Sequence, residues 1–166
     1  MRKAADRLLL RAGGGGINRQ FGAIPYTVVD GQVVFLLVTS RGTGRWIFPK
    51  GDPIEGLRPF ETAAQEAMEE AGIEGEVDPT PIGTYRAFKT LPFRRKVMLV
   101  EMYPLRVTQQ LDEWPEKGRR RRHWAILPEA KRLLSDARVA DLAVKLNRRL
   151  HAKGLPVYPP IAHITR

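Results

Sequence analysis

Two runs of β-branched and aromatic residues near the start of the chain constrain its fold most strongly. The runs Phe21–Val29 and Val33–Thr39 are typical of β-strands, and Asp30-Gly31 stands between them. An Asp-Gly dipeptide suits a two-residue hairpin turn, because both positions of that turn need a positive φ. The sequence therefore predicts a β-hairpin across residues 21–39.

One segment with helical periodicity follows this hairpin. Pro59 suits the first position of a helix, and Gly72 suits a helix end. Between them, apolar residues recur at spacings of three and four, which predicts one amphipathic helix. The residues that share its apolar face are Phe60, Ala63, Ala64, Ala67, Met68 and Ala71.

Further strand and helix signals alternate through the rest of the chain. The predicted elements are strands at Trp46–Phe48, Thr84–Lys89, Val97–Val107 and Trp124–Ile126, and helices near Pro128–Leu134 and at Asp141–His151. This alternation indicates a layered α/β domain with a mixed β-sheet, rather than a helix bundle or a sandwich of strands.

The two ends of the chain differ from its middle. The segment Leu8–Leu10 lies between Arg7 and Arg11, and is much shorter than the roughly 7–15 apolar residues of a signal peptide. The run Gly13–Gly16 is typical of a flexible hinge. We expect residues 1–16 to form a flexible extension, residues 17–154 a single domain, and residues 155–166 an irregular Pro-rich tail. No membrane segment is predicted.

The composition excludes several functional classes. The 166 residues contain no cysteine, so disulfide frameworks, cysteine nucleophiles and iron–sulfur sites are excluded, and a reducing cytoplasm is the expected compartment. There are 28 Lys and Arg against 18 Asp and Glu, a formal net charge of +10. Such a surplus is either a solvated surface or a site for a polyanion.

Three glutamates lie on the helix face opposite the alanines. Glu66, Glu69 and Glu70 share an arc of roughly 100°. The predicted helix contains no Lys or Arg to offset their repulsion, so a cation is expected beside them. Mg²⁺ or Mn²⁺ fits, because hard cations prefer carboxylate oxygens. The alternative is a solvated acidic helix face.

The flanking pattern favours the cation. Gly51, five residues, Leu57, seven residues and then Gln65-Glu66-Ala67-Met68-Glu69-Glu70-Ala71-Gly72-Ile73 resembles the Nudix box, Gly-x5-Glu-x7-Arg-Glu-U-x-Glu-Glu-x-Gly-U, where U is a bulky aliphatic residue. The matching positions are Gly51, Glu66, Glu69, Glu70, Gly72 and Ile73. Leu57 and Gln65 depart from the signature, and the small Ala67 matches only partly.

The resemblance continues outside the box. Thr39-Ser40-Arg41, Arg45-Trp46-Ile47, Leu111-Asp112-Glu113-Trp114 and the segment 118–124 are similar to the diphosphoinositol-polyphosphate and diadenosine-polyphosphate branch of the family. It implies an α/β/α sandwich with the mixed sheet between helices. It also implies a divalent-metal-dependent hydrolase of a phosphoanhydride bond in a nucleoside-diphosphate-linked or inositol polyphosphate substrate.

The resemblance also assigns roles to particular residues. Glu66, Glu70 and the backbone carbonyl of Lys50 would hold Mg²⁺ or Mn²⁺, and Glu69 would be the general base. Divalent cations neutralise the charge of a pyrophosphate and lower the pKa of bound water, while a carboxylate removes its proton. The residues that the resemblance singles out as phosphate contacts are Arg19, Ser40, Arg41, Arg120 and Arg122.

The two departures in the box have a common physical interpretation. In the family the missing Glu and Arg pair with each other, and here both positions, Leu57 and Gln65, are neutral. Losing both charges of a pair can be nearly harmless, whereas losing one strands the other. We therefore expect a coupled replacement that keeps the metal carboxylates functional. Glu55, two positions earlier, is an alternative substitute for the absent glutamate.

Two hypotheses about function follow from these residues. The first is the metal-dependent hydrolase acting on a small polyanionic phosphate substrate. The second is a non-catalytic Nudix-fold protein that binds phosphate or RNA, which the two box departures suggest. Nucleic acid is the less favoured partner, because no basic segment interleaved with aromatic residues is evident. The three Trp residues are expected to be core or loop anchors, and the three His residues structural.

Overall fold

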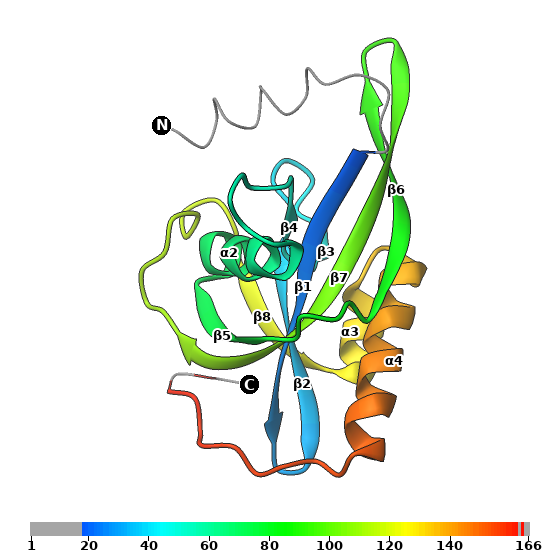
Figure 1. Cartoon of the computed structure of the whole chain (residues 1–166). Helices are drawn as coiled ribbons and strands as arrows, with labels where there is room; N and C mark the ends of the chain where they lie inside the picture. Colours follow the sequence, from blue (N-terminus) through cyan, green and yellow to red (C-terminus); the bar gives the residue numbers. More distant parts are fainter. Residues whose placement is uncertain (1–17, 163, 165–166) are drawn as a thin grey trace.

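A computed structural model describes residues 18–162 and 164, so the N-terminal extension expected at residues 1–16 lies outside the described residues. One eight-stranded mixed sheet forms the centre of the fold, with helix α2 on one face and helices α3 and α4 on the other (Figure 1). The α/β/α arrangement predicted from the sequence is therefore confirmed.

The strands are β1 (Asn18–Val29), β2 (Gln32–Thr39), β3 (Trp46–Ile47), β4 (Lys50–Gly51), β5 (Ile73–Val77), β6 (Gly83–Leu91), β7 (Arg94–Gln110) and β8 (Arg122–Ile126). The helices are α2 (Pro59–Ala71), α3 (Leu127–Leu133) and α4 (Ala137–Ala152). The main path through the sheet is β3-β2-β1-β7-β5, with β4 on β1, β6 on β7 and β8 on β2. The β1–β7 pair is parallel, and the other strand pairs are antiparallel.

The predicted hairpin is confirmed as β1 and β2. Val29 pairs with Gln32, so Asp30 and Gly31 form a two-residue turn. Their φ angles are 50° and 74°, which is the left-handed conformation that this turn requires. The Asp-Gly dipeptide therefore sets the register of the two strands nearest the centre of the molecule.

Two short strands differ from the sequence-based expectation. Lys50 and Gly51 lie beyond the strand predicted at Trp46–Phe48, but they pair with Gly22 and Phe21 of β1. Strand β5 has no strand signal in its Glu74-Gly75-Glu76 centre, and pairing with the long β7 makes it a strand. In both cases tertiary pairing overrides local propensity.

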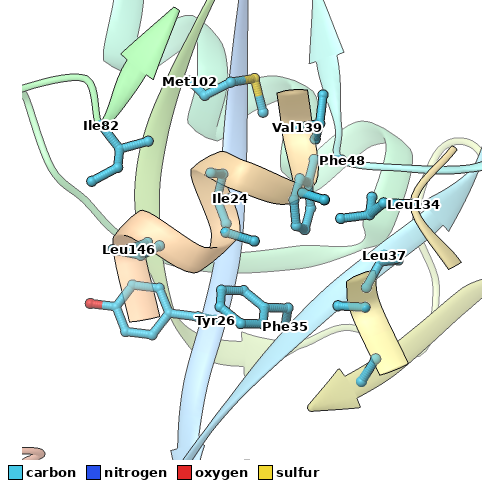
Figure 2. Close-up of a cluster of buried hydrophobic side chains, with 14 of the residues drawn as sticks. Ile24, Tyr26, Phe35, Leu37, Phe48, Ile82, Met102, Leu134, Val139 and Leu146 are labelled. Carbon is cyan, nitrogen blue, oxygen red and sulfur yellow. The ribbon is translucent and has the colours of Figure 1, made fainter. Parts of the chain in front are cut away.

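Both faces of the sheet are buried at β1 and β2, which explains the near-continuous apolar runs in these two strands. Successive side chains point to opposite faces, so Ala23 packs under α2 while Ile24 packs under α4. Figure 2 shows Ile24 in the α4-side core, with Phe35, Met102 and Leu146 among the side chains around it.

Helix α2 has well-defined ends. The backbone N–H of Arg58 donates to Oε2 of Glu61 at 2.8 Å, which closes a capping box at the N-terminus. Gly72 has a φ of 63° and its N–H donates to the carbonyl of Met68, which ends the helix. The fully buried Ala63, Ala67 and Ala71 let the helix lie close to the sheet. The predicted helix at 59–72 is confirmed.

The chain after α4 contains neither helix nor strand between residues 155 and 162, and it packs back onto the domain. Leu155 contacts the core on the α4 side, and Ile161 and Ile164 contact the core on the α2 side. In the part of the chain that the structure describes, no helix combines the length and apolar character that crossing a membrane requires.

Candidate active site

The candidate site is a cleft of about 550 Å³ between α2, β4 and the loop that precedes β8. All three helix glutamates line it, together with Lys50 and Gly51. A Cβ atom on Gly51 would collide with the carboxylate of Glu66, so glycine leaves that carboxylate room against the β4 backbone. The first glycine of the box thus brings the Lys50 backbone beside the glutamates.

Glu70 is the most strongly perturbed carboxylate of the cleft. Burial raises the pKa of Glu70 to about 8; the Arg120 charge opposes this increase, while Glu66 and Glu116 add to it. A hydrogen bond from the Lys50 backbone also favours the charged form of Glu70. Among the described residues, Oε2 of Glu70 is buried without a hydrogen-bond partner. One buried carboxylate oxygen is therefore left to be satisfied by another group.

The other two glutamates have different surroundings. Glu66 is buried against Gly51, with 2% of its surface exposed. Glu69 is half-buried, and its Oε1 accepts a hydrogen bond from Nε2 of Gln65 at 3.1 Å. The two outer glutamates are thus dry and close to backbone, whereas Glu69 is more accessible from the cleft.

This set of donors fits a divalent cation. Within residues 18–162 and 164, no three carboxylate, imidazole or thiol side chains are gathered around one metal position. Two buried carboxylates and a backbone carbonyl would nevertheless supply the hard oxygen ligands that Mg²⁺ and Mn²⁺ prefer. The unpartnered Oε2 of Glu70 is the atom that a cation would satisfy. Glu66, Glu70 and the carbonyl of Lys50 are the residues that would hold it.

Arg120 reaches into the same cleft and is itself buried. Its Nη2 donates to Oε1 of Glu70 at 3.2 Å, and its Nη1 donates to the carbonyl of Thr39 at 3.0 Å. Its Nε lies 3.5 Å from Oε1 of Glu116 but has no hydrogen bond. Arg120 therefore links the end of β2 to the helix and partly neutralises the glutamates.

Arg122 lies elsewhere. Its Nη1 donates to the carbonyls of Ala71 and Gly72, at 3.1 and 3.4 Å, and its guanidinium lies 4.0 Å from the centre of the Trp114 ring. Trp114 in turn donates from Nε1 to the carbonyl of Glu70. Arg122 thus caps the C-terminus of α2, and this position does not favour the phosphate contact predicted for it.

The remaining predicted phosphate contacts are distributed around the cleft. Arg41 lines it, and its Nη1 lies 3.8 Å from Oε1 of Glu116. Ser40 forms a 2.7 Å hydrogen bond with Thr43 and lines a neighbouring pocket. Arg19 forms an ion pair of 3.3 Å with Glu101 on the adjacent β7. Of the five predicted contacts, only Arg41 and Arg120 line the cleft.

The two box departures can also be located. Leu57 is 39% exposed in the loop before α2, and Gln65 has its amide on Glu69. Glu55 is exposed and does not line the cleft. The amide–carboxylate contact gives Gln65 a role in orienting Glu69, which the sequence alone did not indicate.

Sequence reasoning missed several cleft residues. Asp52 follows Gly51 and accepts a hydrogen bond from Gln20 of β1 at 3.2 Å. Glu116 comes from the loop before β8, and Lys89 comes from β6. Only Asp52 had a sequence signal, its position next to the box glycine. The other residues reach the cleft through tertiary structure.

A second pocket of about 480 Å³ adjoins the cleft. Its lining includes the aromatic residues Trp46, Phe48 and Tyr85, together with Asp136 at the start of α4. Lys50 borders both spaces, with its Nζ 5.8 Å from the centre of the Tyr85 ring. Burial lowers the pKa of the Lys50 ammonium. Lys50 therefore lines both the cleft that contains the three glutamates and the partly apolar second pocket.

Comparison with known proteins places the chain in a family. The family model of the NUDIX domain matches residues 18–142. Nudix hydrolase 12, mitochondrial, of Arabidopsis thaliana is 33% identical over 132 residues, covering 66% of this chain and 62% of the relative. Nudix hydrolase 21, chloroplastic, of the same plant is 30% identical over 150 residues, covering 86% and 73%. The chain belongs to the Nudix hydrolase family.

Solved structures show the same fold. The NUDIX domain of Shewanella oneidensis NrtR complexed with ADP ribose aligns with a TM-score of 0.65 at 15% identity, covering 87% of this chain and 98% of that domain. A C. elegans Ap4A hydrolase aligns with a TM-score of 0.58 at 20% identity, covering 81% and 99%. The chain spans 62% of the length of Nudix hydrolase 12 and 63% of the length of Nudix hydrolase 13, mitochondrial, of the same plant.

Proposed function

We propose that this protein is a divalent-metal-dependent hydrolase that cleaves a phosphoanhydride bond. One observation carries the proposal: a buried carboxylate oxygen of Glu70 without a hydrogen-bond partner, beside the buried Glu66 and the accessible Glu69 in one cleft. A protein that only binds a polyanion has no use for three carboxylates at that place, since they repel it. Family membership supports the same chemistry.

Several residues in and beside the cleft have a definite task in such a reaction. A bound divalent cation neutralises phosphate charge and lowers the pKa of water. Glu69 accepts the proton of the attacking water at its carboxylate, which the Gln65 amide orients through Oε1. Arg41, at the rim of the cleft, attracts the phosphate oxygens of the substrate. The products are two phosphate-terminated fragments.

The adjoining pocket supports a nucleoside-linked substrate. Its aromatic side chains Trp46, Phe48 and Tyr85 offer a flat base rings to pack against, which the non-aromatic ring of a polyphosphorylated inositol cannot use in the same way. One structural neighbour is an Ap4A hydrolase and another is complexed with ADP ribose, and both molecules join a base to a phosphoanhydride through a ribose. We therefore propose a dinucleotide or nucleoside-diphosphate-linked substrate.

The test is a substrate panel with controlled metal. Purified protein is assayed for phosphate-terminated products from diadenosine polyphosphates, ADP ribose and other nucleoside diphosphate sugars, diphosphoinositol polyphosphates and capped RNA, with Mg²⁺, with Mn²⁺ and with chelator. We expect turnover of a nucleoside-linked substrate that needs the metal. Preference for the inositol compounds would contradict the substrate assignment. No turnover of any compound would favour the non-catalytic alternative.

A further inference from the structure

Strands β6 and β7 continue past the start of β1 as a two-stranded arm (Figure 1). Strand β1 begins with Asn18 paired to Met98, so the earlier residues of β7 pair, among the described residues, only with β6. The arm consists of residues 88–97, because Phe88 pairs with Val97, and its turn lies between the paired Leu91 and Arg94. A two-stranded hairpin by itself gains little stability from folding. The side chains that this arm carries therefore indicate its function.

The arm and the strand residues at its base carry a single sign of charge. Five cations and no acidic residue occur between residues 83 and 100, and the cations are Arg86, Lys89, Arg94, Arg95 and Lys96. None of the five forms an ion pair within the described part of the chain. The cross-strand pair of Lys89 and Lys96 even places two like charges opposite each other. Such an arrangement is unfavourable in the free protein and becomes favourable beside an anion.

Exposed aromatic rings accompany these charges. Phe93, at the turn, is fully exposed, and Phe88 is 52% exposed. The guanidinium of Arg95 lies 4.8 Å from the centre of the Phe88 ring. Phe93 directly precedes the basic triplet 94–96 in the sequence, and the hairpin pairing places Phe88 opposite Val97, at the other end of that triplet. Flat rings beside unpaired cations are the combination that single-stranded nucleic acids bind.

We propose that this arm binds single-stranded nucleic acid, with the phosphates along its cations and bases stacked on Phe88 and Phe93. Lys89 of the arm also lines the cleft of the three glutamates, so a bound strand has a continuous basic path toward that cleft. A second copy of this chain is a poor occupant, because its own arm carries the same charge. An anionic membrane would contact only the tip of the arm, whereas Phe88 lines the second pocket, which adjoins the cleft. The proposal does not depend on hydrolysis.

The first experiment distinguishes binding by the arm from nonspecific attraction by the positive net charge of the protein. Binding of a 5′-phosphorylated oligonucleotide of about 12 nucleotides, in ribose and deoxyribose forms, is followed by fluorescence anisotropy with chelator present and at several salt concentrations. The triple variant Arg94→Gln, Arg95→Gln, Lys96→Gln is compared with a matched triple variant on α3 and α4, Arg132→Gln, Lys145→Gln, Arg148→Gln. All six side chains except the half-buried Lys96 are exposed.

The effect of the arm's cations on the salt dependence of oligonucleotide binding has an expected size. The slope of log affinity against log salt should become shallower by about 2 in the arm variant, because about 0.7 counterions are released per neutralised phosphate of a single strand. The matched variant should keep the wild-type slope. Equal slopes for the two triple variants would overturn the proposal, as would wild-type protein that binds neither oligonucleotide. Preference for one sugar would support it and identify the strand as RNA or DNA.

The second experiment tests the aromatic ring. Phe93→Ser should weaken oligonucleotide binding about 5- to 150-fold, the range expected for losing one stacked base. The control is Val157→Ser, which removes an equally exposed apolar side chain from the C-terminal segment and should leave binding unchanged. If Phe93→Ser abolished binding to phosphatidylserine vesicles without affecting the oligonucleotide, the arm would be a membrane contact and the proposal wrong. Hydrolysis of a dinucleotide should be unaffected by Phe93→Ser, which keeps this test separate from the proposed enzymatic function.

Discussion

Nη2 of Arg120 lies 3.2 Å from Oε1 of Glu70, and the two side chains are only 9% and 7% exposed. A buried ion pair at this position partly neutralises the carboxylate while leaving its second oxygen, Oε2, without a hydrogen bond. The Arg120 guanidinium also donates to the carbonyl of Thr39 and lies near Glu116, so its position does not depend on Glu70 alone. The pair explains how a dry carboxylate is kept in place before a cation binds.

Replacing Glu70 by Gln should stabilise the metal-free protein at alkaline pH. Because the pKa of Glu70 is raised from 4.5 to about 8, the folded state binds more protons than the unfolded state between these values. Wild-type stability therefore falls as the pH rises from about 4.5 to about 8. We expect Glu70→Gln to raise the free energy of unfolding at pH 8 by about 1–3 kcal/mol, with a smaller difference at pH 5. Urea unfolding with chelator at both pH values measures this, and a variant less stable at pH 8 would contradict it.

Removing Arg120 should have the opposite effect. Arg120→Met leaves the buried Glu70 and the half-buried Glu116 without their shared cation. We expect a loss of about 3–5 kcal/mol at pH 8, the range for breaking a buried ion pair. Adding Glu70→Gln to Arg120→Met should recover part of that loss. Chemical unfolding of the four proteins of this cycle checks the coupling, and additive effects would mean that the two groups do not interact.

Arg122→Ala distinguishes the sequence-based role of this residue from its structural one. As a phosphate contact, Arg122 would contribute to the salt dependence of substrate binding. As the cap of α2 stacked on Trp114, its loss should lower the free energy of unfolding by about 1–2 kcal/mol. The structure predicts the loss of stability with an unchanged salt dependence of KM. A stable variant with a flatter salt dependence would restore the sequence-based role.

Gly51→Ala should damage activity more than stability. The added Cβ atom meets the end of the Glu66 side chain, which is flexible enough to move aside. A displaced carboxylate no longer has the position that the cation needs, so we expect kcat to fall about 100-fold. Thermal unfolding with chelator should change little by comparison. Ala63→Gly on the opposite face of the same helix is a control with the reverse pattern, since it changes packing far from the cleft.

Substitutions at the two neutral box positions, Leu57 and Gln65, should have non-additive effects on the metal requirement. Gln65→Arg alone would remove the amide contact to Glu69 and add a guanidinium that competes with the cation for the glutamates. The metal concentration for half-maximal rate should rise. Leu57→Glu in the same protein should relieve this defect, with a coupling of about 0.5–3 kcal/mol. Metal titrations of the four proteins measure it, and strictly additive effects would show that positions 57 and 65 do not interact.

The elements that the sequence predicted are those with local signals. The hairpin follows from Asp30-Gly31, and helix α2 follows from Pro59, the spaced alanines and Gly72. Strand β5 could not be predicted, because its residues have low strand propensity and are ordered by β7. Elements with local signals were thus found, and those made by long-range pairing were missed.

The candidate site shows the same division. The three glutamates were predictable because one helix fixes their relative positions. Arg120 and Arg122 are the same residue type two positions apart, yet one enters the cleft and the other caps the helix. The chain itself carries no feature that separates them, since the distinction comes from how the loop before β8 crosses the end of α2.

The proposed hydrolase function depends most directly on whether Glu70 and Glu66 hold a divalent cation. Binding of Mn²⁺ to the protein without substrate, followed by the electron paramagnetic resonance signal of the free ion at pH 8, measures this without any assumption about the substrate. We predict that the wild-type protein binds Mn²⁺ and that Glu70→Gln weakens the affinity by more than about 100-fold, while Glu129→Gln, which removes a carboxylate outside the cleft, has no effect. An affinity for Mn²⁺ that is the same in the wild-type protein and in Glu70→Gln would contradict the assigned metal site.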